Sequence, residues 1–153
     1  MIVPSAGQNR RVPVFGALDA MTGQLTPMIT EHKRSDDFIA FLHLLVDRVY
    51  ADRRHVYLFL DNCSIHHTQA VRQFLAARRE RVTVIWNARY APNLNLIERF
   101  WGHLKLNAFH NYFFGSVTAL ETAIKQTIKA LNRDANHPLH LNLRTAQALG
   151  KAA

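Results

Sequence analysis

The segment that most constrains the fold is the apolar run HVYLFL at residues 55–60, which leads directly into Asp61. A run of this kind is typical of a strand that is buried on both faces, at the centre of a sheet covered by helices. A helix predicted over residues 68–79 and a strand over 82–86 follow it. Because a strand–helix–strand order indicates a parallel crossover, the region predicts an α/β fold.

A β-hairpin is predicted ahead of this region. Residues 11–18, RVPVFGAL, are rich in strand formers, and residues 25–30, LTPMIT, form a returning strand after a turn at Gly23. Pro13 and Pro27 cannot donate hydrogen bonds to a ladder, which places both strands near an edge or shortens their pairing.

Helices are predicted around these strands from apolar residues at helical spacing. The first begins with Ser35 as its cap, and the last begins with Ser116 as its cap. Between them, the turn-forming stretch 87–95 leads into a helix that ends near Phe109. The apolar seam of that helix comprises Leu94, Ile97, Trp101, Leu104 and Ala108. The architecture is therefore a mixed α/β sheet with helices on its faces.

Length and composition limit the number of domains and the kinds of partner that the chain can have. The 153 residues suit one domain, which we expect to occupy residues 1–135, followed by a tail of uncertain structure at 136–153. Nineteen Lys and Arg against eleven Asp and Glu give a net charge of +8, which favours a nucleic-acid partner. The single Cys63 excludes an internal disulfide framework. With no membrane-spanning run or signal peptide in the sequence, we expect a soluble protein of the bacterial cytoplasm, associated with the nucleoid.

Asp61 and Glu98 are the candidate catalytic and metal-binding residues. Asp61 follows the most apolar strand, and ligands of open α/β sheets gather at the carboxyl ends of strands. Glu98 lies on a helix at the border between its apolar seam and solvent, and Lys105 projects from nearly the same side two turns later. Such an arrangement suits metal-assisted chemistry on a phosphate. The alternatives are a turn-capping role for Asp61 and an ordinary exposed position for Glu98.

Two local strings resemble one known family. LFLDNCSIHHTQAVRQFL and RYAPNLNLIERFWGHLK are similar to the catalytic core of DDE-type transposases, in the mariner-like insertion-sequence superfamily. That family has a strand ending in Asp-Asn followed by a His, and then a Tyr-x-Pro-x-Leu-Asn-Pro-x-Glu-x-x-Trp-x-x-x-Lys signature. The matching positions are Asp61, Asn62, His66, Tyr90, Pro92, Leu94, Asn95, Glu98, Trp101 and Lys105.

The resemblance implies an RNase H-like fold, lacking its first strand, that cleaves and transfers DNA strands with two divalent ions, Mg²⁺ or Mn²⁺. Asp61 would be the second and Glu98 the third metal-binding acid. The implied DNA-binding residues are Lys105, Arg99, His66 and Arg89, although a structural contact within the turn is an equal alternative for His66. Asn62 would orient the loop, and Trp101 would belong to the core. The implied partners are transposon ends and target DNA, a homo-oligomer on the DNA, and an upstream transposase segment, but no membrane.

The sequence also departs from the family pattern. Asn87, Ala88 and Arg89 replace the Leu-Pro that precedes the tyrosine, and Leu96 replaces the second proline. The first acid of the family lies on a strand upstream of the hairpin, and this sequence begins after that point. Asp19 is a less favoured substitute because it is expected to lie in a turn. We therefore expect a catalytic domain that is inactive alone.

Two other functions are compatible with the sequence. One is a non-catalytic, DNA-binding transposase remnant that acts through its basic charge. The other is a zinc protein that uses Cys63, His66, His67 and other histidines, although Cys-x-x-His-His lacks a second ligand pair at the spacing of a zinc finger.

Overall fold

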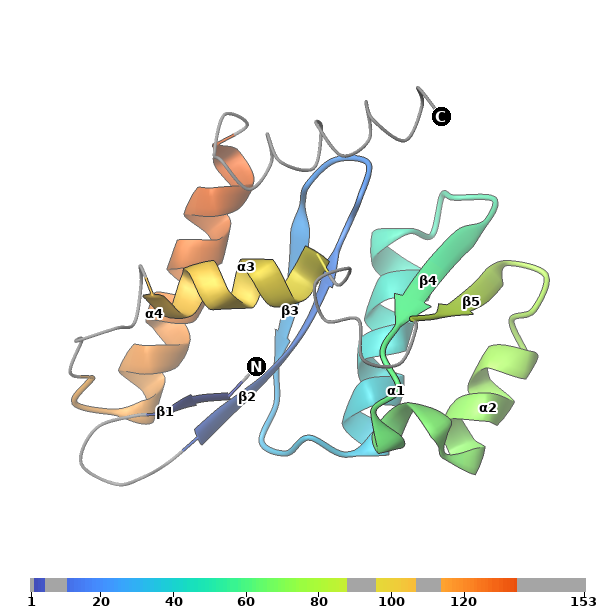
Figure 1. Ribbon diagram of the computed structural model, residues 1–153, viewed down its shortest axis with the longest axis horizontal. Coiled ribbons are helices and arrows are strands. Elements are labelled where there is room, and N and C mark those ends of the chain that lie inside the picture. The colour runs from blue at the N-terminus through green and yellow to red at the C-terminus, as the bar shows by residue number, and fades with distance from the viewer. Residues whose placement is uncertain (1, 5–10, 88–95, 107–113, 135–153) are drawn as a thin grey trace. The chain divides into compact units, whose positions relative to one another are not determined.

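The computed structural model describes residues 2–4, 11–87, 96–106 and 114–134. The chain forms two compact units, one from residues 1–29 with 99–153 and one from residues 30–98. In chain order, the elements are β1 (Ile2–Pro4), β2 (Arg11–Leu18), β3 (Leu25–Ile29), α1 (Ser35–Leu44), the π-helical η1 (Leu45–Val49), β4 (Val56–Leu60), the 3₁₀ turn η2 (Ser64–His67), α2 (Gln69–Ala76), β5 (Val82–Trp86), α3 (Leu96–Leu104) and α4 (Val117–Arg133) (Figure 1).

The first unit contains the predicted hairpin. Strands β1, β2 and β3 form an antiparallel sheet in that order, with Gly16 of β2 opposite Pro27 of β3. Asp19 caps the turn between β2 and β3, because its Oδ1 accepts hydrogen bonds from the backbone N–H groups of Met21 at 2.8 Å and Thr22 at 3.2 Å. Gly23 takes a φ of 76°, a conformation that glycine adopts without steric cost. The hairpin prediction and the turn position of Asp19 are confirmed.

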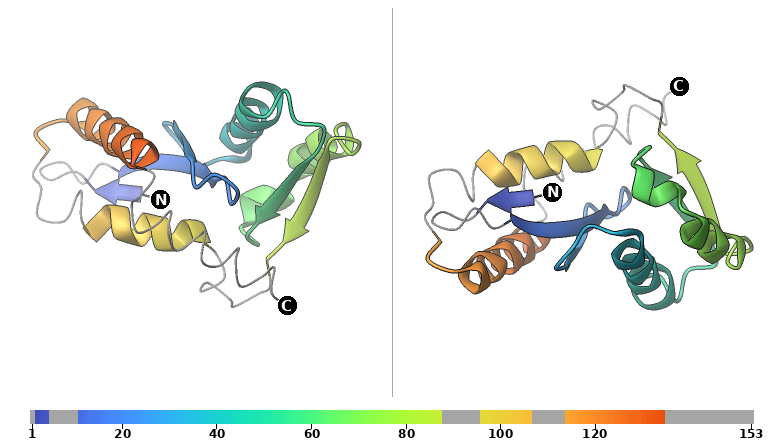
Figure 2. Two further views of the ribbon diagram at one scale, coloured as in Figure 1. Left: turned by 90° about the horizontal axis from the view of Figure 1, so that it is seen from above. Right: turned by 90° about the horizontal axis from the view of Figure 1, so that it is seen from below.

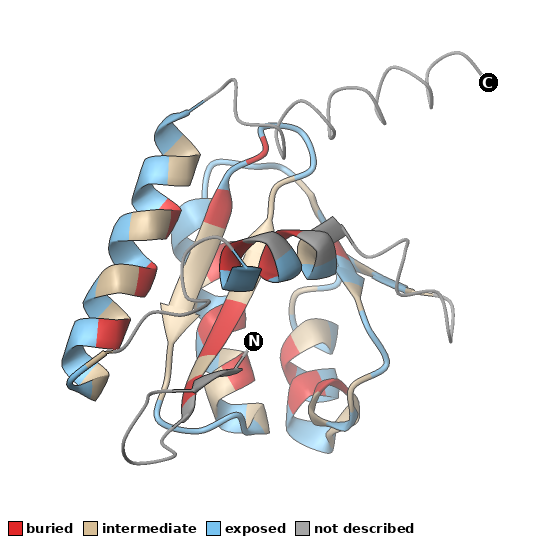
Figure 3. Cartoon of the chain, turned by 60° about the vertical axis from the view of Figure 1, so that its left-hand side comes forward, coloured by how far each residue is buried: buried red, intermediate tan, exposed pale blue. Residues whose placement is uncertain are grey.

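Helices cover both faces of this sheet. The part of α3 that belongs to this unit lies on the face opposite α4 (Figure 2). Helix α4 begins as predicted, because the Ser116 Oγ accepts the backbone N–H of Ala119 at 3.1 Å. Near its end, the Asn132 amide bonds both backbone groups of Leu25 and so fixes α4 to β3. The buried side of α4 forms one stripe along the helix (Figure 3), which comprises Leu120, Ile124 and Ile128.

The second unit contains the two-stranded parallel sheet β4–β5, with Val56 opposite Val82 and Leu60 opposite Trp86. The parallel crossover is therefore confirmed. Helices α1 and α2 pack against each other, and α2 begins at Thr68, whose Oγ1 accepts the N–H of Val71 at 3.4 Å. The core of this unit comprises Phe38, Phe41, Leu42, Leu45, Val46, Leu58, Val71, Phe74 and Val82.

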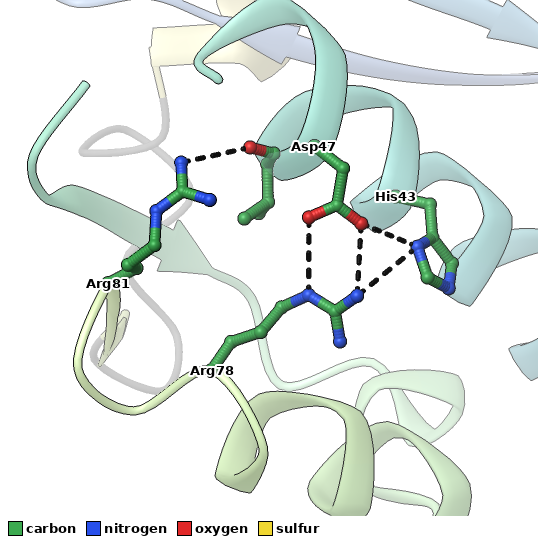
Figure 4. A network of polar contacts seen from close by, with 5 residues as sticks. His43, Asp47, Arg78 and Arg81 are labelled. Carbon is green, nitrogen blue, oxygen red and sulfur yellow. Dashed lines mark hydrogen bonds and ion pairs between the residues drawn. The ribbon is translucent and has the colours of Figure 1, made fainter. Parts of the chain in front are cut away.

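A polar network ties the end of α1 and η1 to the residues after α2 (Figure 4). The Asp47 carboxylate lies 3.0 Å from the Arg78 guanidinium and 2.7 Å from the His43 ring. These two hydrogen bonds, led by that of Arg78, lower the pKa of Asp47. The Arg78 guanidinium also lies 3.9 Å above the ring of Phe74, and Arg81 donates to backbone carbonyl groups of η1 and the following turn.

The structure corrects two predicted elements of the second unit. Strand β4 is not buried on both faces, since Tyr57 is 63% and Phe59 64% exposed, because no described element covers that side of the β4–β5 sheet. Helix α1 is not capped by Ser35, which is its first helical residue. Arg34 occupies the cap position, where its N–H donates to the Asp37 carboxylate at 3.0 Å.

The predictions for α3 and the C-terminal region have mixed outcomes. Helix α3 spans Leu96–Leu104, and its predicted end near Phe109 lies outside the described residues. Its buried side includes Phe100, which the predicted seam omitted. Trp101 is 5% exposed, as expected for a core residue. The tail predicted at residues 136–153 lies outside the described residues, and the single domain over 1–135 stays a prediction. None of the described helices is long and apolar enough to cross a bilayer.

Candidate functional site

Asp61 is the first residue after β4, where the strand gives way to a short loop and the turn η2. Its side chain is 49% exposed. The backbone N–H of Cys63 donates to Asp61 Oδ1 at 3.1 Å, so the carboxylate caps the turn that follows the strand. The turn-capping alternative is therefore confirmed, and it uses only one of the two carboxylate oxygens.

His66 holds the same carboxylate from the protein interior. Its Nδ1 lies 3.0 Å from Asp61 Oδ1 and 3.1 Å from the Asp61 backbone oxygen. Because both partners are acceptors, Nδ1 carries the hydrogen and donates to the pair. The ring packs against Phe38, with 4.1 Å between ring centroids, and the residue is only 9% exposed. His66 makes the structural turn contact that the sequence offered as an equal alternative, and its contact with DNA stays a prediction.

These contacts keep Asp61 ionised. The hydrogen bond from His66 is the largest cause of a lowered pKa at Asp61, and the Cys63 N–H and the charge of Lys33 act in the same direction against partial burial. The second oxygen, Oδ2, receives no hydrogen bond from the described part of the chain. An ionised, half-exposed carboxylate with one oxygen left unbonded by the described residues fits the ligand chemistry of a hard divalent cation.

The rim of the β4–β5 sheet around Asp61 is held by backbone and amide contacts. The N–H of Asn87 donates to the Leu60 carbonyl at 2.8 Å, and the Asn62 side-chain amide donates to the Asn87 carbonyl at 2.9 Å. Asn62 thus joins the loop after β4 to the end of β5, as expected of a residue that orients the loop.

The other predicted site residues lie on or near α3. Glu98 and Lys105 are both exposed, whereas Phe100, Trp101 and Leu104 between them are buried. Arg99 lies on the same helix, and Arg89 lies outside the described residues. The meeting of Glu98 with Asp61 around one ion stays a prediction.

The structure does not form the zinc site considered from the sequence. Within the described ranges, no three His, Cys, Asp or Glu side chains gather where they could hold an ion. His66 is bonded to Asp61, whereas the next residue, His67, stacks on Trp86. The adjacent histidines therefore point to different partners.

Sequence comparison decides the family. Residues 1–121 match the family described as DDE superfamily endonuclease. The chain belongs to that family. A curated relative of this endonuclease domain is the insertion element IS630 uncharacterized 39 kDa protein of Shigella sonnei, which is 26% identical over 130 residues. That match covers 85% of this chain and 37% of the relative, so the chain spans little more than a third of the relative's length.

Solved structures show the fold of the DDE endonuclease domain. The catalytic domain of Mos1 mariner transposase matches with a TM-score of 0.67 at 16% identity, over 94% of this chain and 71% of that chain. The same domain solved with raltegravir and Mg gives 0.65, at 16% identity and over 94% and 72% of the two chains. A chain of the simian T-cell lymphotropic virus intasome in complex with PP2A regulatory subunit B56 gamma gives 0.60, at 17% identity and over 90% and 54%. The predicted RNase H-like fold is confirmed.

Sequence reasoning missed two features of the surroundings of Asp61. Lys33 acts on the charge of Asp61 across 28 positions of sequence, and the only local signal was its place in the basic cluster HKR at 32–34. The buried contact of His66 with Phe38 joins two elements that no local pattern connects. Both features arise from packing of α1 and its preceding loop beside the end of β4.

Proposed function

We propose that Asp61 and Glu98 are two acidic ligands of a divalent cation, in a site that cleaves and transfers DNA strands. The observation that carries the proposal is the state of Asp61, an ionised carboxylate at a strand end with one oxygen held by His66 and the other without a hydrogen bond from the residues that the structure describes. Membership of the DDE superfamily endonuclease family supports the reaction class. When bound, the ion would activate the attacking oxygen or stabilise the leaving oxygen of a phosphodiester.

The ion is proposed to be Mg²⁺ or Mn²⁺. Carboxylate oxygens are the ligands that these ions prefer, whereas a zinc site would favour thiolate and imidazole. The Mos1 catalytic domain, which has the same fold, has been solved with Mg. In this chain, His66 would not bind the ion itself. It would hold Asp61 in one orientation through Oδ1, so that Oδ2 is presented to the ion.

The proposed substrate is DNA, as transposon end and target. The net charge of +8 supports a polyanionic substrate, and the exposed Lys105 lies two helical turns after Glu98, directly after the end of α3. Arg99 and Arg89 are proposed as further contacts to the DNA backbone. A homo-oligomer on the DNA and an upstream transposase segment are the proposed protein partners.

Calorimetric titration with Mn²⁺ tests the shared site. The wild-type chain is expected to bind one ion at the site, and Asp61→Asn and Glu98→Gln are each expected to abolish that binding. Asp52→Asn is the control, because it removes a surface carboxylate that the proposal does not use, 78% exposed against 49% for Asp61. Unchanged binding in Asp61→Asn or Glu98→Gln would contradict the proposal.

Duplex binding measured in parallel separates the proposal from the non-catalytic alternative. Fluorescence anisotropy of a labelled duplex should show affinity that falls steeply as salt rises, because phosphate contacts release counterions. Salt-dependent duplex binding together with no Mn²⁺ binding by the wild-type chain would instead support a DNA-binding remnant.

A further inference from the structure

An exposed aromatic stack lies beside the proposed metal-binding acid. His67, the last residue of η2, stacks on Trp86, the last residue of β5, with 4.3 Å between ring centroids and 25° between ring planes. Trp86 nevertheless keeps 41% of its surface exposed. Large apolar rings are usually buried, so an indole held in this way at the surface is a candidate contact for a ligand with a flat face.

The stack and Asp61 share one rim. Trp86 pairs with Leu60, the residue before Asp61, in the parallel register of β4 and β5. Hydrogen bonds from Asn87 to Leu60 and from Asn62 to Asn87 tie the two strand ends together. His67 directly follows His66, which holds Asp61. The aromatic platform and the carboxylate are therefore fixed to the same short piece of backbone.

From this arrangement, we infer that the His67–Trp86 pair is a stacking platform for an unpaired nucleobase of single-stranded DNA. The inference rests on the proposed function, since it places the base next to the phosphate chemistry at Asp61. A base in an intact duplex is covered on both faces by its neighbours, whereas an unpaired base has a face free for an aromatic side chain. The exposed Lys33, whose charge acts on Asp61, supplies a cation at the same rim for the adjoining phosphate.

The predicted effect is selective for single strands. Removing a stacking aromatic weakens single-stranded binding by about 5- to 150-fold in Kd, the range that corresponds to the stacking free energy of one base. Duplex binding through phosphate contacts should change by no more than about twofold, because Trp86 carries no charge. A general loss of basic surface would instead weaken the binding of single-stranded DNA and of duplex DNA together.

Intrinsic fluorescence provides a direct test on the whole chain. The sequence contains two tryptophans, and Trp101 is 5% exposed, so emission that responds to a ligand reports on Trp86. Titration with a twelve-nucleotide oligothymidylate is expected to quench the wild-type tryptophan emission. The Trp86→Phe variant, in which Trp101 is the remaining tryptophan, is expected to show no quenching. Wild-type emission that does not change at saturation would overturn the inference.

Affinities measured by anisotropy complete the test. Trp86→Leu should weaken oligothymidylate binding by the stated factor and leave binding of a matched duplex unchanged. Tyr57→Leu is the matched control, since it removes another exposed aromatic residue from the same two-stranded sheet. Equal oligothymidylate affinity in the wild type and Trp86→Leu, or an equal loss in Tyr57→Leu, would refute the platform.

These measurements distinguish failure of the stacking platform from failure of the proposed function. Circular dichroism and Mn²⁺ titration of the Trp86 variants are expected to match the wild type, because the indole is not an ion ligand. Intact Mn²⁺ and duplex binding without a Trp86 effect would refute only the platform. If the wild-type chain does not bind Mn²⁺ but still shows quenching that depends on Trp86, only the metal site is refuted.

Discussion

His66→Phe is the substitution that most clearly separates the hydrogen bonding of His66 to Asp61 from the packing of its ring. Phenylalanine keeps an aromatic ring beside Phe38 but removes the Nδ1–H that donates to the Asp61 side chain and backbone oxygens. A hydrogen bond to a charged group contributes roughly 1.5 to 3 kcal/mol, and the 49% exposure of Asp61 places this one at the low end. We expect His66→Phe to lower the free energy of unfolding by about 1 to 2 kcal/mol.

A double-mutant cycle in urea, followed by far-ultraviolet circular dichroism, measures this effect. Asp61→Asn removes the charge, so His66→Phe should cost less in that background than in the wild type. The lowered pKa of Asp61 adds a pH dependence. The stability that this carboxylate contributes is present above about pH 4 and is lost as the pH falls through its folded-state pKa. A cost of His66→Phe that is the same with and without the Asp61 charge would refute the reasoning.

Three further predictions concern packing, capping and the surface network. Leu42→Ala removes a fully buried side chain and should lower the free energy of unfolding by about 2 to 5 kcal/mol, whereas the exposed Arg72→Ala should change it by less than about 0.5 kcal/mol in urea titrations. Ser116→Ala should cost about 1 kcal/mol and Ser116→Asp much less, in the same assay, because aspartate also accepts the Ala119 N–H. Arg78→Ala should destabilise the chain by about 1 kcal/mol or less, and by a smaller amount in 1 M NaCl, because salt screens its pairing with Asp47. An Arg78→Ala cost that salt does not reduce would assign the effect to the Phe74 contact instead.

Local signals predicted much of the fold. The hairpin was predictable because strand-forming runs flank a turn with Gly23, and the starts of α2 and α4 because Thr68 and Ser116 cap them. The start of α1 was misjudged because Asp37, rather than Ser35, supplies the capping hydrogen bond to the chain ahead of the helix. The exposed face of β4 was not predicted because an apolar run does not specify which of its faces packs against another element.

The site was predictable only in its residue types. The strand end at Asp61 and the helix position of Glu98 follow from local sequence. The buried His66–Phe38 packing, the Lys33 charge and the His67–Trp86 stack each join segments that are 19 or more positions apart. Such contacts depend on how elements pack, and spacing along the chain does not encode them.

Iron-directed cleavage of the polypeptide tests the central claim, that Asp61 and Glu98 hold the same ion. Fe²⁺ bound in place of Mg²⁺ generates hydroxyl radicals with ascorbate and peroxide, which cut backbone close to the ion, and mass spectrometry locates the cuts. The account predicts cuts both near residue 61 and near residue 98, with both sets lost in Asp61→Asn and in Glu98→Gln. Cuts near one acid only, or cuts near residue 98 that persist in Asp61→Asn, would contradict it.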